Sequence, residues 1–168
     1  MQLSSAPAAQ SILLPVRAGT ILASLAAALL LNFLPWNSIA LVLAFWCVRQ
    51  PRLVGLGAAW LLGLLTDVGN GVLLGQHALA YCLLAFAAIA LSRRILWFPL
   101  WGQALHVAAL LLFAQGVSAL VRLSAGADFP GWVIATGPLI GAVLWPVVSV
   151  LLLLPQRMPT DVDETRAI

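Results

Sequence analysis

Apolar residues fill most of the chain in long runs, and arginines and prolines divide these runs from one another. A helix needs about twenty apolar residues to cross the hydrocarbon core of a bilayer. The pattern predicts six membrane-spanning helices, at residues 18–34, 36–48, 53–75, 76–92, 97–121 and 131–154. We therefore expect an all-α, polytopic membrane protein with a lead at 1–16, a six-helix transmembrane domain at 17–154 and a tail at 155–168.

Two of these predicted helices do not fit a simple span. Residues 36–48 give a helix about 20 Å long at about 1.5 Å per residue, whereas the hydrocarbon core is about 30 Å thick. In the third helix, the run Asp67-Val68-Gly69-Asn70-Gly71 weakens helical structure, so that helix is expected to end or unwind near Asp67. Irregular backbone at membrane depth has to be covered by protein or line a cavity. Both features predict a site between helices in this part of the chain.

The distribution of charge adds an orientation. The chain is 63% hydrophobic and 8% charged, and its net charge of +3 comes from scattered arginines without any lysine, so no nucleic-acid surface is predicted. Only Arg122 falls on one side of the six-helix layout. The other side receives Arg17, Arg49, Arg52, Arg93, Arg94, Arg157 and Arg166. Because cytoplasmic loops carry the excess of basic residues, we expect both the lead and the tail to be cytoplasmic.

The tryptophans are a further guide to depth in the membrane. Trp60 and Trp145 lie in the middle of predicted spans and are expected to pack inside the protein. The remaining five lie near span ends, where an interfacial aromatic belt is expected: Trp36, Trp46, Trp97, Trp101 and Trp132.

A row of small residues with one carboxylate is the strongest candidate for a site. Every fourth position from residue 55 reads Gly55, Ala59, Gly63, Asp67, Gly71 and Gly75. Small residues let another helix approach closely, and an ionisable residue among them is a functional-site hypothesis because lipid solvates it poorly. An alternative is that Asp67 caps a helix beginning near Gly71. We predict that Gly63, Asp67, Gly71 and Gly75 line a partner-helix contact or the central crevice of the fold.

Other reactive side chains do not form a recognisable catalytic or metal-binding pattern. Ser118 and His106 lie twelve positions apart on one predicted helix, about 18 Å along its axis, which is too far for a serine and histidine pair. His77 and His106 lack a third metal ligand, and Cys47 and Cys82 lie inside apolar runs. We therefore expect no enzymatic activity, cofactor or metal.

The residues from 35 to 80 resemble those of the MreD family, the membrane subunit of the bacterial rod-shape machinery, or elongasome. The resemblance rests on Pro35, Phe45-Trp46, Pro51 and Trp60, and above all on the pattern G-L-L-x-D-x3-G-x2-L-G-x2-A-L, which starts at Gly63 and ends at Leu79. Where the family commonly has Tyr-Trp, this chain has Phe45-Trp46 and so lacks one hydroxyl group.

The resemblance implies a non-enzymatic scaffold in the bacterial inner membrane. Such a scaffold would bind the single-span protein MreC and help couple MreB filaments to peptidoglycan synthesis by RodA and its penicillin-binding transpeptidase partner. It also implies a fold similar to the substrate-binding subunits of ECF-type vitamin transporters. The alternative is therefore a substrate-capture subunit of such a transporter, with Asp67, Asn70 and Gln76 lining its pocket.

Overall fold

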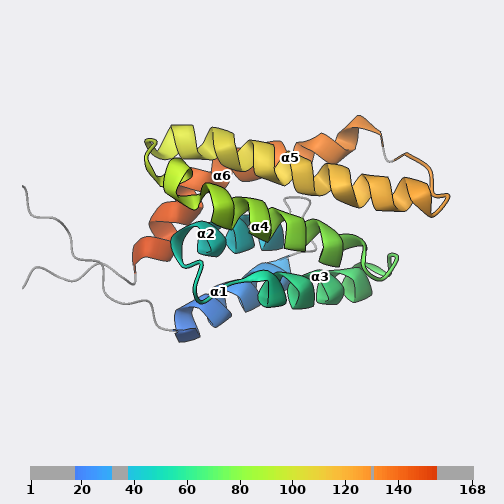
Figure 1. The fold of residues 1–168 in the computed structure, drawn as a ribbon, viewed down its shortest axis with the longest axis horizontal. Coiled ribbons are helices and arrows are strands. Elements are labelled where there is room, and N and C mark those ends of the chain that lie inside the picture. Colours follow the sequence, from blue (N-terminus) through green and yellow to red (C-terminus); the bar gives the residue numbers. More distant parts are fainter. Residues whose placement is uncertain (1–17, 32–37, 130, 155–168) are drawn as a thin grey trace, which may run out of the picture.

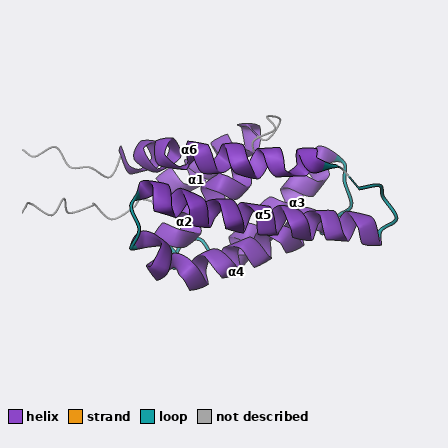
Figure 2. Ribbon diagram, turned by 90° about the horizontal axis from the view of Figure 1, so that it is seen from above, coloured by secondary structure: helices purple, strands orange, loops and turns teal. Residues whose placement is uncertain are grey.

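The computed structural model describes residues 18–31, 38–129 and 131–154, and within these ranges the fold is all-α (Figures 1 and 2). The helices are α1 (Ala18–Leu30), α2 (Ser38–Arg49), α3 (Leu56–Asn70), α4 (Gln76–Leu96), α5 (Leu100–Ser124) and α6 (Thr136–Leu153), with a 3-10 turn, η2 (Trp132–Ala135), leading into α6. The predicted lead and tail, together with Pro35 and Trp36, lie outside the described residues.

The helices run alongside one another with their connections at the two ends of the bundle (Figure 1). Three segments are long and apolar enough to cross a membrane, namely α4 with 21 residues, α5 with 25 and the η2–α6 segment with 22. The helices α1, α2 and α3 are shorter, with 13, 12 and 15 residues. The prediction of six helices is confirmed for the described residues, whereas the crossing of the bilayer by all six stays a prediction.

Helix α3 ends at Asn70, short of the predicted bound at residue 75, so the expectation that this helix ends near Asp67 is confirmed. Gly71 has a φ of 61°, and its N–H bonds to the carbonyls of Asp67 and Val68, which closes the helix. A left-handed residue after the last turn is a common helix terminus, and glycine adopts it without steric cost. The apolar residues that follow therefore belong to a loop, and α4 starts at Gln76.

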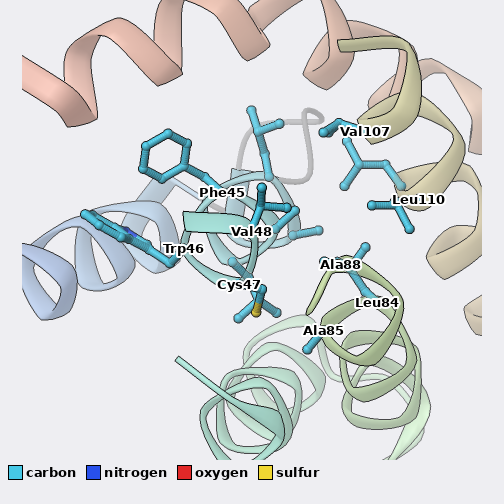
Figure 3. Close-up of a cluster of buried hydrophobic side chains, with 14 of the residues drawn as sticks. Phe45, Trp46, Cys47, Val48, Leu84, Ala85, Ala88, Val107 and Leu110 are labelled. Atoms are coloured by element: carbon cyan, nitrogen blue, oxygen red, sulfur yellow. The ribbon is translucent and has the colours of Figure 1, made fainter. Parts of the chain in front are cut away.

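The short helix α2 lies at the centre of the bundle. Nine of its residues are buried: Ile39, Ala40, Leu41, Leu43, Ala44, Phe45, Trp46, Cys47 and Val48. It packs on α1, α4, α5 and α6. Figure 3 shows side chains of α2 meeting Leu84, Ala85 and Ala88 of α4 and Val107 and Leu110 of α5. A helix that is apolar on all sides belongs in such a core, and because protein surrounds it, α2 does not need the length of a lipid-exposed span.

Two of the described tryptophans differ from the prediction in whether they are buried or exposed. Trp46 was expected at the interface but is 1% exposed, and its indole N–H donates to Ser24 Oγ at 2.8 Å. Trp60 was expected to pack inside but is 50% exposed on α3, so both of these expectations were wrong. Trp145 is fully buried as predicted, 5.8 Å from the ring of Phe45. Trp97, Trp101 and Trp132 are exposed at helix ends, as an interfacial belt requires.

Candidate functional site

Asp67 lies in the last turns of α3 and is fully buried. The chain reverses direction in the loop that follows (Figure 1). The side chain of Asp67 faces the first turn of α4. Glycines set both ends of this loop, because Gly71 with φ 61° ends α3 and Gly75 with φ 100° precedes α4. Positive φ angles are strained for residues that carry a Cβ atom, so these two positions favour glycine.

The carboxylate of Asp67 binds the exposed backbone N–H groups at the start of α4. Its Oδ2 accepts from the N–H of Gly75 at 2.8 Å and from that of Ala78 at 3.4 Å, and its Oδ1 accepts from the N–H of His77 at 2.9 Å. The first N–H groups of a helix have no intrahelical partner, and Gly75 has no side chain with which to cap them. Asp67 therefore caps α4 from the neighbouring helix, where the positive end of the helix dipole also favours its charge.

The imidazole of His77 completes the surroundings of this carboxylate. His77 Nδ1 lies 2.8 Å from Asp67 Oδ1, and because an ionised carboxylate can only accept, Nδ1 is the protonated nitrogen. The ring of Tyr81, one turn further along α4, meets the His77 ring edge-on at 5.8 Å. The side chains of Asp67 and His77 thus join α3 to α4 at one end of the bundle. These contacts match the alternative, in which Asp67 caps a helix, except that the helix starts at Gln76 rather than near Gly71.

Gly63, one turn before Asp67, brings the backbones of α3 and α4 into close approach. A Cβ atom at position 63 would lie 2.5 Å from the nitrogen of Ala78 and 2.7 Å from the carbonyl carbon of His77. The small-residue face therefore lets two helices of the same chain pack together, as small residues do in membrane proteins. The prediction placed Gly63, Asp67, Gly71 and Gly75 at one site, and the structure places the first two inside the α3–α4 contact and the last two in its loop. Their role in a partner contact stays a prediction.

A polar cavity lies next to this contact, and the sequence did not predict it as one site. It has a volume of about 320 Å³ and its lining includes Asn70, Gln76, His77, Ser118 and Arg122. Gln76 Nε2 donates to Ser118 Oγ at 2.8 Å, which joins α4 to α5 behind the cavity. Asn70 and Gln76 were named as pocket residues in the transport hypothesis, whereas Asp67 lies behind them and does not line the cavity. The loop between α3 and α4 was the feature of the sequence that could have indicated this cavity. It makes α4 start at Gln76, and the first side chains of that helix face the end of α5.

The remaining candidates for chemistry stay apart. His106 Nδ1 bonds to the carbonyl of Gly102 at 2.8 Å, and Ser118 bonds to Gln76, so the serine and the histidine do not form a pair. Within residues 18–31, 38–129 and 131–154, no three histidine, cysteine or acidic side chains come close enough to hold a metal ion.

Comparison with known proteins identifies the family. Residues 14–154 match the family described as rod shape-determining protein MreD. The rod shape-determining protein MreD of Haemophilus influenzae is 32% identical over 143 residues, which cover 79% of this chain and 88% of that protein. No solved structure matches the chain significantly, and the likeness to ECF-type subunits stays a prediction. The long apolar helices and these matches agree, and the chain belongs to the MreD family of membrane proteins, which has a role in cell shape.

Proposed function

We propose that this chain is a non-enzymatic scaffold of the bacterial elongasome. It binds an MreC-like single-span protein in the inner membrane and helps couple MreB filaments to peptidoglycan synthesis by RodA and a penicillin-binding transpeptidase. Membership of the rod shape-determining family supports a role in cell shape. The shape of α3 supports a docking role and indicates where the partner helix binds.

The helix α3 lies at the edge of the bundle and packs mainly on α4. Its outward face carries Trp60, Leu61, Leu65 and Val68, each at least half exposed. The glycines of α3 differ between its two faces. Gly63 leaves no room for a Cβ atom, whereas a Cβ atom at Gly57 or Gly69 would have nothing within 4 Å. No contact in the described chain uses the space beside these two glycines.

This outward face is the observation that carries the proposal. Positions 57, 61, 65 and 69 follow one another at helical spacing, so two glycines flank two exposed leucines along the same side of α3. Glycines on an exposed membrane helix let a second helix approach closely, and exposed leucines supply the side chains that pack against it. Gly63 and Asp67 hold α3 in place through its opposite face, which packs on α4, and Gly71 and Gly75 shape the loop at its end. We propose that the four predicted residues act in this way.

The positions of the arginines support the orientation. Arg49 is the last residue of α2 and Arg52 follows that helix, and Arg93 and Arg94 lie in the last turn of α4, at the end of the bundle where α3 begins. Arg122 lies in the last turn of α5, at the opposite end. With the basic end in the cytoplasm, both termini are cytoplasmic, and the loop between α3 and α4 faces outward from the cell.

Photo-crosslinking in native membranes tests the proposal. A crosslinking amino acid at position 65 lies on the outward face of α3, whereas one at Val143 lies on an exposed part of α6. We expect position 65 to capture a single-span cell-shape protein and position 143 to capture none. Capture of an ATPase-linked subunit or of a small molecule from position 65 would instead move the chain to the transport class.

A steric variant tests the face itself. Gly69→Leu adds bulk in open space, whereas Gly71→Leu would also force a side chain into a positive φ angle, so position 69 is the cleaner choice. We expect Gly69→Leu to reduce recovery of the partner about tenfold with normal expression, because it keeps the two helices apart. The matched control is Gly19→Leu on α1, which also has open space. Equal recovery of the partner with both variants contradicts the proposed face.

The polar cavity favours a second candidate function. Its volume of about 320 Å³ is near the lower limit for small-ligand sites, and Asn70 and Gln76 line it. These features fit the substrate-capture subunit of an ECF-type transporter. The crosslinking experiment separates this function from the scaffold, because a transport subunit would associate with an energising module.

A further inference from the structure

Helix α5 ends, α4 begins and η2 leads into α6 at the same end of the bundle (Figure 1). Two hollows adjoin there. One is the polar cavity of about 320 Å³. The other is an apolar groove of about 270 Å³ along α5. Gln115, Ala119 and Ile134 line both, so the two hollows lie next to each other. A polar chamber beside an apolar groove has the form required by an amphiphile.

The polar chamber is suited to an anion. Arg122 is half-buried in its wall, and among the described residues no carboxylate forms an ion pair with it. Asp67 does not line the chamber and is already bound by His77 and the start of α4. Asp128 is exposed in the loop after α5 and does not line the chamber either. The side chain of Asn70, which also lines the chamber, adds an amide donor. Guanidinium and amide N–H groups together recognise phosphate oxygens.

The groove is suited to a hydrocarbon chain. Its walls include Leu120, Leu123 and Phe129, all exposed, and it runs beside Gly116. A Cβ atom at Gly116 would have nothing within 4 Å, so this glycine leaves the groove open. The two hollows extend over the last turns of α5, from Leu112 to Leu123. Arg122 lies near the end of this 25-residue helix, at the depth where lipid headgroups meet the hydrocarbon core.

We propose that the two hollows together bind one anionic phospholipid, with its phosphate beside Arg122 and one acyl chain in the groove. The cation in the chamber and the apolar groove next to it support this occupant over a free anion, since a free anion would use the chamber alone. The proposal does not depend on the scaffold function, because it concerns the isolated chain.

Lipid titration of the purified full-length chain, followed by native mass spectrometry, tests this inference. The added compounds are phosphatidylglycerol, the zwitterionic phosphatidylcholine and inorganic phosphate. We expect one phosphatidylglycerol per chain, bound about tenfold more tightly than phosphatidylcholine and not displaced by millimolar phosphate. Equal binding of the two lipids would overturn the proposal.

Two variants separate the headgroup from the chain. Arg122→Gln removes the cation and is expected to weaken phosphatidylglycerol binding about fivefold. Gly116→Leu fills the groove and is expected to weaken it by a similar factor, whereas Gly19→Leu on α1 has no effect. Displacement by inorganic phosphate together with unchanged binding in Gly116→Leu would show a free-anion site and refute the lipid. Because none of these variants alters the proposed partner face on α3, failure of the scaffold proposal would not change this result.

Discussion

A buried carboxylate is costly in an apolar protein unless hydrogen bonds compensate its lost hydration. Asp67 receives that compensation from three backbone N–H groups and the imidazole of His77. Charge-assisted bonds of this kind are among the strongest in proteins. Asp67 therefore fixes where α4 begins relative to α3.

Replacing Asp67 with asparagine keeps the size of the side chain but exchanges one acceptor oxygen for an NH2 group. At least one of the donors around position 67 then loses its partner. We expect Asp67→Asn to lower the free energy of unfolding by about 1–3 kcal/mol. The thermal-unfolding midpoint of the purified chain in mild detergent measures the loss. Asp128→Asn, in an exposed loop, is the control, and equal midpoints for the two variants would show that the cap contributes nothing.

At the scale of elements, α3 and α4 form a hairpin held by one close backbone contact and one cap. The contact depends on Gly63, because a larger residue meets the backbone of Ala78 rather than a flexible side chain. Backbone cannot move aside without separating the helices. The hairpin also carries the proposed partner face on its outer side, so its geometry bears on function as well as on stability.

The two faces of α3 lead to opposite expectations for the same substitution. Gly63→Ala should destabilise the chain by about 1–3 kcal/mol, because the added methyl group forces α3 away from α4. Gly57→Ala should leave stability unchanged or raise it by up to about 1 kcal/mol, because alanine is the better helix former and has open space there. Thermal unfolding of the two variants side by side measures the difference. A lower midpoint for Gly57→Ala than for Gly63→Ala would contradict this assignment of faces.

At the scale of the whole molecule, the positively charged end and the cavity end lie at opposite ends of the bundle. In the proposed orientation, with the basic end in the cytoplasm, the cavity and the loop after α3 would face the other side of the membrane. The proposed lipid would then come from the outer leaflet of the inner membrane. Orientation thus decides which lipids and which part of a partner can reach these sites.

Cysteine labelling checks this orientation. Ala127→Cys lies in the exposed loop after α5, and Pro51→Cys lies in the exposed turn after α2. Cys82 is replaced by alanine first, and Cys47 can stay because it is fully buried. A membrane-impermeant maleimide added to spheroplasts should label Ala127→Cys at once and Pro51→Cys only after permeabilisation. The reverse pattern would place both termini outside the cytoplasm.

The sequence by itself determined the class of protein, the positions of the helices and the family. The membrane class and the long helices follow from length and hydrophobicity, which are local properties of the chain. The predicted helices 76–92, 97–121 and 131–154 correspond closely to α4, α5 and the η2–α6 segment. The row with Gly63 and Asp67 was also visible, because spacing alone places these residues on one face of a helix.

The tertiary structure decided which faces point inward. It placed α2 at the centre, and it buried Trp46 but left Trp60 exposed, the reverse of what was expected. The side chain of Asp67 binds α4, the neighbouring helix in the same chain. The tertiary structure also brought Gln76 and Arg122, 46 positions apart, into one cavity. The reason is physical: lipid and protein core are equally apolar, so hydrophobic periodicity does not distinguish a buried face from a lipid-facing one. Packing against other helices makes that distinction, and it is a property of the assembled fold.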